Sequence, residues 1–233
     1  MQTNVSEHER LNEALNDPTV LAEYAASCGS YRPGVLPHLL GGILVGMGNI
    51  VYGKEPTYLK FRAIEIIARV PYFSWVAAMY TLMTLFFTDE RKAMKFARVS
   101  HFARMAQDNE TMHVVVISKL ALAVNHRAGV IRHTIIPMLF AFGYYWASYL
   151  LYFVKRRWAL ELNYIFENHA YEQYSEFLTR YEHELKHVYV DSEFLDWYGR
   201  NPRSQYEFFR SVRNDELIHR NASLHEITAQ KSF

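Results

Sequence analysis

Cysteine is almost absent from this chain of 233 residues, in which Cys28 is the only one. A single thiol cannot build an intramolecular disulfide framework, a Cys-rich zinc site or a Cys-x-x-Cys-His haem attachment. Because free cysteine behaves as a small apolar residue, we expect Cys28 to be a buried bystander. A metal site in this chain would therefore have to use carboxylate and imidazole ligands.

An excess of either charge is also absent. The 25 basic and 24 acidic residues give a formal charge of +1, which argues against a nucleic-acid partner held by bulk electrostatics. The first ten residues lack both the apolar core of a secretory signal and the acid-poor, Arg-rich character of a transit peptide. We therefore expect that the chain is made where it works, or that an upstream extension is missing.

Charged residues are missing altogether from three apolar stretches, each close to the roughly 20 residues that a membrane-spanning helix needs. They cover residues 35–53, 70–88 and 134–154. Proline and glycine interrupt the rest of the chain at only a few places, so the sequence predicts an all-α protein. We expect helices over about residues 5–16, 35–52 and 57–87, then from Asp89 to about residue 126, over 134–154, through Glu167, over 191–198 and after Pro202.

Four carboxylates recur along these helices in a defined order: Glu65, then Glu110 with His113, then Glu167, then Glu216 with His219. Two helices that give one Glu each and two that give Glu-x-x-His form the ligand set of a di-iron or di-manganese helical bundle. Residues three apart share a helix face, so each Glu and its His can approach the same metal centre. The pattern predicts a ferritin-like four-helix bundle with a di-iron site, plus extra membrane-associated helices.

Some of these residues also have a simpler interpretation. Glu65 has Arg62 and Arg69 nearby in sequence and could form a surface ion pair. A third Glu-x-x-His pair, Glu184 with His187, lies in a polar run that we interpret as a solvated helix face. Glu167 has apolar and aromatic neighbours, and a buried Glu needs a partner such as a metal ion. The order of all four segments carries the inference further than any one of them.

The sequence resembles the alternative oxidase family, non-haem di-iron quinol oxidases, at four signatures between about Lys60 and Arg220. The family's Leu-Glu-Thr followed by Val-Pro is similar to Ile64-Glu65-Ile66 followed by Val70-Pro71. Its Asn-Glu-Arg-Met-His is similar to residues 109–113. Its third signature is Leu-Glu-Glu-Glu-Ala followed by a Tyr and then by Glu-Phe-Leu, and these parts are similar to residues 166–170, Tyr174 and residues 176–178. Its Arg-Ala-Asp-Glu-Ala-His-His-Arg is similar to residues 213–220.

This resemblance implies two iron ions held by six residues: Glu65, Glu110, His113, Glu167, Glu216 and His219. Whether the two histidines ligate iron or support the ligands stays open. Asn109 and Asp215 are expected to orient the histidines, and Tyr174, two helical turns beyond Glu167, could supply an electron and a proton. A quinone pocket is expected at Lys60, Ile64, Phe166 and Ala170.

The chain also departs from the family pattern. Lys60 replaces an Arg, Leu160 replaces a His, and Asn168 and His169 replace two carboxylates. The departures affect the surroundings of the site, so redox chemistry is better supported than the identity of the reductant.

The resemblance implies a quinol oxidase that reduces O2 to water without pumping protons, within a single domain of residues 1–233. An arm would cover residues 1–34 and the di-iron bundle residues 57–227. Alternatives are a related di-iron hydroxylase of a quinone precursor or lipid, and a non-catalytic iron-binding protein of the membrane surface.

Membrane topology can be argued from the ligand order. If residues 70–88 and 134–154 both spanned the bilayer, Glu110 would lie on the opposite side from Glu65, Glu167 and Glu216. We therefore expect a monotopic protein bound to the lipid of one leaflet. The resemblance implies the same arrangement, as a homodimer, in a bacterial inner membrane, or in the mitochondrial inner membrane if a transit peptide is missing. The tyrosines and Trp146 within residues 144–152 suit the interface, and the basic run 155–157 suits its head groups.

Overall fold

The computed structural model describes residues 7–124 and 128–229. Within these ranges the chain is all-α, with nine α-helices, one π-helical turn and no strand, which confirms the predicted fold class. The described residues form two compact units. One unit combines parts of 1–45, 160–191 and 201–233, and the other comprises parts of 46–159 and 192–200.

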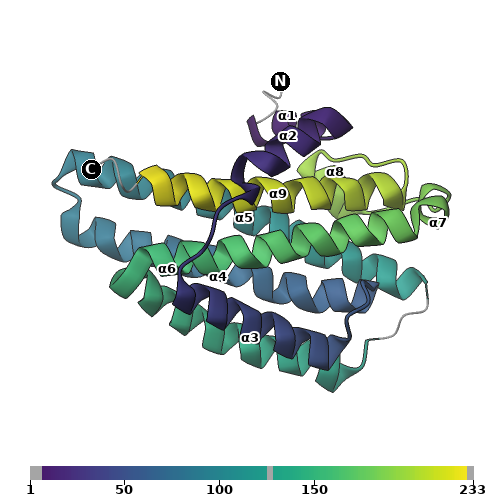
Figure 1. The fold of residues 1–233 in the computed structure, drawn as a ribbon, viewed down its shortest axis with the longest axis horizontal. Helices are drawn as coiled ribbons and strands as arrows, with labels where there is room; N and C mark the ends of the chain where they lie inside the picture. The colour runs from purple at the N-terminus through teal and green to yellow at the C-terminus, as the bar shows by residue number, and fades with distance from the viewer. Residues whose placement is uncertain (1–6, 125–127, 230–233) are drawn as a thin grey trace. The chain divides into compact units, whose positions relative to one another are not determined.

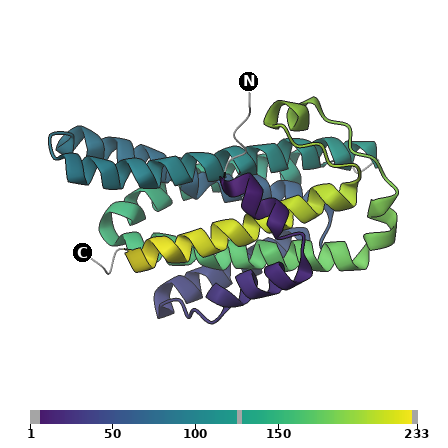
Figure 2. The ribbon, with the colours of Figure 1, turned by 90° about the horizontal axis from the view of Figure 1, so that it is seen from above.

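In the second unit, α4 (Tyr58–Phe86) and α5 (Glu90–Ala123) form an antiparallel pair, which lies side by side in Figures 1 and 2. Both helices begin at a capped residue, because Thr57 Oγ1 accepts a hydrogen bond from the Lys60 amide and Asp89 Oδ1 accepts one from the Lys92 amide. The predicted cap at Asp89 is confirmed. Tyr72 and Trp75 are fully buried in the core of this pair.

The first half of α6 (Ile136–Arg180) packs on α4 after the π-helical turn η1 (Ile131–Ile135). Ser74 Oγ and Ser148 Oγ lie 2.9 Å apart, and the rings of Trp75 and Tyr152 are 5.6 Å apart. As the sequence predicts, two helices meet here: α6 joins them across a kink at Lys155, whose backbone is not helical (φ −153°, ψ 72°). The short helix α8 (Glu193–Tyr198) packs against α5.

In the first unit, the second half of α6 runs antiparallel to α9 (Gln205–Ala229). Asn163 Nδ2 donates to Ser223 Oγ at 3.1 Å, and the rings of Tyr174 and Phe209 lie 6.1 Å apart. The helices α1 (Glu7–Ala14), α2 (Pro18–Gly29) and α7 (Glu182–Lys186) pack against α9.

The helix α2 was not expected, because Asp17-Pro18 reads as a stop signal for the preceding helix. The structure uses both residues as a start signal: Asp17 Oδ1 accepts hydrogen bonds from the amides of Thr19 and Val20, and Pro18 occupies the first helical position. Cys28 near the end of α2 is buried, as predicted.

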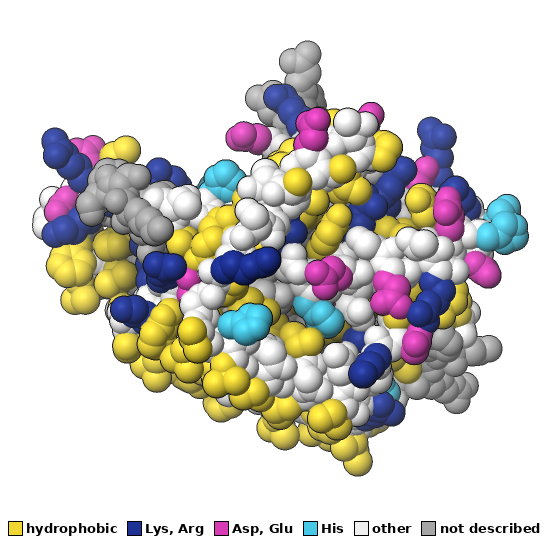
Figure 3. Space-filling view, viewed as in Figure 1, with side chains coloured by type: hydrophobic (Ala, Val, Ile, Leu, Met, Phe, Trp, Pro, Cys, Tyr) yellow, Lys and Arg dark blue, Asp and Glu magenta, His cyan; other side chains and the backbone are white. Residues whose placement is uncertain are grey.

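Three helices are long and apolar enough to cross a membrane, by length and composition: α3 (Val35–Tyr52), α4 and the segment Ile131–Arg180. Hydrophobic side chains on α3 lie on the surface (Figure 3). The exposed residues repeat every three or four positions: Val35, Leu39, Ile43, Met47 and Ile50. The first half of α6 has a similar exposed stripe that includes Leu139, Phe142 and Trp146, whereas Tyr152, expected at the membrane interface, is buried.

Candidate metal centre

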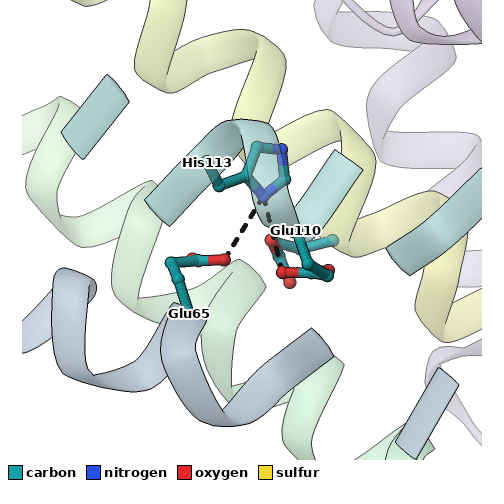
Figure 4. A group of neighbouring side chains, drawn as sticks. Glu65, Glu110 and His113 are labelled. Atoms are coloured by element: carbon teal, nitrogen blue, oxygen red, sulfur yellow. Dashed lines mark ion pairs between the residues drawn. The ribbon is translucent and has the colours of Figure 1, made fainter. Parts of the chain in front are cut away.

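Three predicted ligands lie together where α4 faces α5 (Figure 4). His113 Nδ1 is 3.3 Å from Glu65 Oε2 and 3.6 Å from Glu110 Oε2. Each of the three residues offers a ligand atom within 4.8 Å of the others, and all three side chains are buried. Glu65 therefore is not the surface ion pair that its neighbours Arg62 and Arg69 allow.

The electrostatics of this first triad are unfavourable for ionised carboxylates without a cation. Burial, followed by the nearby carboxylate of Glu110, raises the pKa of Glu65 from 4.5 to about 8, and the nearby imidazole of His113 offsets only part of this shift. A divalent cation would reverse the balance, because it stabilises the ionised carboxylates that coordinate it.

The other three predicted ligands form a second triad between α6 and α9. Glu167, Glu216 and His219 also offer ligand atoms within 4.8 Å of one another, and all three are buried. Asn163 Nδ2 donates a hydrogen bond of 3.2 Å to Glu167 Oε1 and a second bond to Ser223. Asn163 lies one turn before Glu167 and holds its carboxylate from the same helix.

The donor set in these triads fits iron or manganese. Four carboxylates and two imidazoles are the ligands of di-iron carboxylate proteins, and burying six such groups costs free energy unless they are paired or bind metal. The described residues contain no thiolate in either triad. The chemistry of the donors therefore fits a non-haem metal in each triad and does not fit a thiolate site.

The residues predicted to support the ligands are buried as well. Asn109, Tyr174 and Asp215 are 6%, 0% and 0% exposed. Tyr174 packs against Phe209 of α9, in the first unit. Asp215 accepts hydrogen bonds from two residues that the sequence did not single out, His8 and Asn12 of α1. Their only signal in the sequence is a spacing of four, which places them on one face of a polar helix.

The residues predicted to line a quinone pocket lie on α4 and α6. Lys60 is buried, and its ammonium donates hydrogen bonds to Asn49 Oδ1 at 3.1 Å and to the Lys54 carbonyl at 2.9 Å. Ile64 and Phe166 are half-buried and Ala170 is buried. The ammonium of Lys60 thus connects α4 to the residues that end and follow α3.

The third Glu-x-x-His pair lies outside both triads, as expected. Glu184 and His187 are exposed at α7, and His187 Nδ1 lies 2.6 Å from the carbonyl oxygen of His183. Spacing alone therefore does not distinguish the metal-ligand candidates; burial does.

Comparison with known proteins identifies the family. The family model described as "Alternative oxidase" matches residues 42–228. The chain is also similar to "Ubiquinol oxidase 4, chloroplastic/chromoplastic" of Arabidopsis thaliana, with 25% identity over 186 residues. That match covers 71% of this chain and 50% of the relative, so the chain spans about half the length of the curated relative. No solved structure gives a significant match. Because the family model covers more than half of its residues, this chain belongs to the alternative oxidase family.

Proposed function

We propose that this protein is a membrane-bound quinol oxidase, which couples quinol oxidation to the four-electron reduction of O2 to water and pumps no protons. The observation that carries the proposal is the pair of buried triads, each with two carboxylates and one imidazole. Membership of the alternative oxidase family and the name of the plant relative support quinol as the reductant.

The two triads together are proposed to hold two iron ions, which supply one-electron redox chemistry and a binding place for O2. This requires both triads within one domain, as the sequence predicts for residues 1–233. The carboxylates provide negative charge to balance the two cations, and the imidazoles of His113 and His219 act either as ligands or as their hydrogen-bonded supports.

The stoichiometry follows from the electron count. Two quinols lose four electrons and four protons and become two quinones, and one O2 takes up four electrons and four protons to form two waters. The reaction balances without another reductant. We assign the quinol site to Lys60, Ile64, Phe166 and Ala170, and a redox role to the buried phenol of Tyr174.

A monotopic attachment explains the exposed apolar stripes without a membrane span. The other face of the first half of α6 is packed on α4 through Ser148 and Tyr152. Because α4 pairs along its length with α5, which carries Arg91, Arg98 and Arg104, a spanning α4 would bring these charges towards the hydrocarbon. We propose that α3 and the first half of α6 lie in one leaflet, and that the protein is a homodimer.

Oxygen uptake by the purified, iron-loaded protein with a quinol as sole reductant tests the function. We expect two quinones for each O2 consumed, no oxygen atom in the organic product and no inhibition by cyanide, because the site has no haem. Incorporation of labelled oxygen into the quinone would instead indicate a di-iron hydroxylase. Bound iron without turnover would leave a non-catalytic iron-binding protein.

A further inference from the structure

The N-terminal helix α1 presents one buried face to α9. His8, Asn12 and Leu15 are 6%, 5% and 0% exposed, whereas Glu7 and Glu13 are exposed. The buried residues follow a helical spacing of four and three, so they lie on one side of the helix and just beyond its end. Two of these three side chains are polar.

Both polar side chains reach the same oxygen atom. His8 Nε2 lies 2.7 Å from Asp215 Oδ1, and Asn12 Nδ2 donates to that atom at 2.6 Å. Asn12 also donates to the Ser211 carbonyl at 2.8 Å, and Asn214 Nδ2 donates to the Asn12 carbonyl at 2.9 Å. Hydrogen bonds in both directions therefore fix α1 to the turn of α9 that contains Asp215.

This turn of α9 leads directly into the second triad. Glu216 follows Asp215 in the sequence, and the ring of His219 lies 5.8 Å from that of His8. Leu15 packs in a buried cluster with Leu217 and Ile218, which lie between the two triad residues of α9. Thus α1 and the residue that follows it contact α9 on both sides of Glu216 in the sequence.

We propose that α1 is a positioning element of the metal centre, in which His8 and Asn12 act through Asp215 to fix Glu216 and His219. This inference rests on the proposed metal centre. An apolar contact would dock a short helix at a lower desolvation cost than a buried carboxylate with two polar partners. The polar partners instead restrict the position and orientation of Asp215, in the way that residues around a metal site orient its ligands.

Release of iron from the loaded protein to an excess of chelator measures this positioning. His8→Leu replaces the hydrogen-bonding ring with an apolar side chain. We expect iron release to be at least about tenfold faster, which is the smallest change usual when a residue that supports the metal ligands is lost. His8→Gln keeps an NH donor and is expected to restore release to within about threefold of wild type. Glu13→Ala, on the exposed side of α1, is the matched control and should leave release unchanged.

The absorption spectrum of the cobalt-substituted protein separates positioning from folding. Its ligand-field bands report the ligand geometry, and they should shift in His8→Leu and return in His8→Gln. A lower melting temperature of the metal-free variant with unchanged bands and release rate would overturn the inference, because α1 would then only stabilise the fold. If His8→Leu does not fold, Asn12→Ser, whose shorter side chain cannot reach Asp215, provides the same two measurements.

A double-mutant cycle tests the route through Asp215. In an Asp215→Ala background, His8→Leu should accelerate iron release no further, because the partner of His8 is already gone. Additive effects would show that His8 acts by another route and would overturn the inference. A wild-type protein that retains iron but does not oxidise quinol would contradict the proposed function alone, whereas one that binds no iron would contradict both.

Discussion

His113 Nδ1 lies 3.3 Å from Glu65 Oε2 and joins α5 to α4 at the predicted metal centre. The contact connects two residues whose motifs lie far apart in the sequence, and it is possible because the helices are antiparallel and both side chains face the shared core. Neither helix alone contains a complete ligand set for one metal ion. A metal ion at this position would therefore be held by side chains from both helices.

Replacing Glu110 or Glu216 with Ala should remove iron and activity together, because each carboxylate belongs to a buried triad. We expect quinol oxidation to fall by more than about a hundredfold, beyond the usual effect of losing a residue that only supports a ligand. Iron analysis and oxygen uptake measure the two losses. Glu184→Ala is the control, because Glu184 has the same Glu-x-x-His spacing but is exposed. Full iron content in both triad variants would contradict the assignment of the ligands.

Removal of metal should make the stability of the protein depend on pH through Glu65. In the metal-free protein the pKa of Glu65 is raised from 4.5 to about 8, so the folded state binds this proton more tightly than the unfolded chain. The resulting stabilisation is fully present below pH 4.5 and is lost as the pH rises through about 8. Denaturant unfolding of chelator-treated protein between pH 5 and 8 should therefore show a free energy of unfolding that falls with rising pH.

Glu65→Gln is the matched variant for this prediction, because its amide stays neutral throughout the range. The metal-free variant should lose the contribution of Glu65 to the pH dependence, and iron loading should reduce that dependence in the wild type, since the cation pairs with the ionised carboxylate. An equally steep dependence in metal-free Glu65→Gln would assign it to other groups.

The sequence predicted the helices that bear the triads because their signals are local. Asp89 caps α5 as expected, and Glu65, Glu110 and Glu167 are buried in helices with apolar neighbours. The break within α6 could also be predicted, because the uncharged stretch ends at the basic run that begins with Lys155, and the backbone of Lys155 is not helical. The helix α2 was missed because Asp-Pro can end one helix or begin the next, and the local sequence does not distinguish the two.

The contact of α1 with the second triad could not be predicted either. His8 and Asp215 lie at opposite ends of the chain, and a single sequence gives no sign that two such residues meet. The residues around Asp215 were identified through the Glu-x-x-His motif, whereas His8 belongs to no motif. Its role depends on a tertiary contact that forms only when α1 docks on α9.

Both ends of the apolar segment 134–154 should be accessible from the same side of a membrane. Arg132 and Arg157 flank this segment and are exposed, and a helix that lies in one leaflet leaves both ends in the same aqueous compartment. Limited trypsin treatment of sealed vesicles that carry the protein on their outer face, followed by mass spectrometry, measures the accessibility. Cleavage after Arg132 and Arg157 from opposite sides would demonstrate a membrane span.

Tyr174→Phe should separate redox chemistry from assembly. The substitution removes only the phenolic hydroxyl and keeps the ring that packs against Phe209, so folding and iron content should be preserved. If the phenol donates an electron and a proton during oxygen reduction, quinol oxidation per iron should fall by at least about tenfold, which corresponds to roughly 1.4 kcal/mol in the barrier. Steady-state oxygen uptake normalised to bound iron measures the change, and Phe209→Leu, which alters the packing of Tyr174 but keeps its hydroxyl, is the control. Unchanged uptake per iron in Tyr174→Phe would reduce Tyr174 to a packing residue and leave the redox function to the two triads.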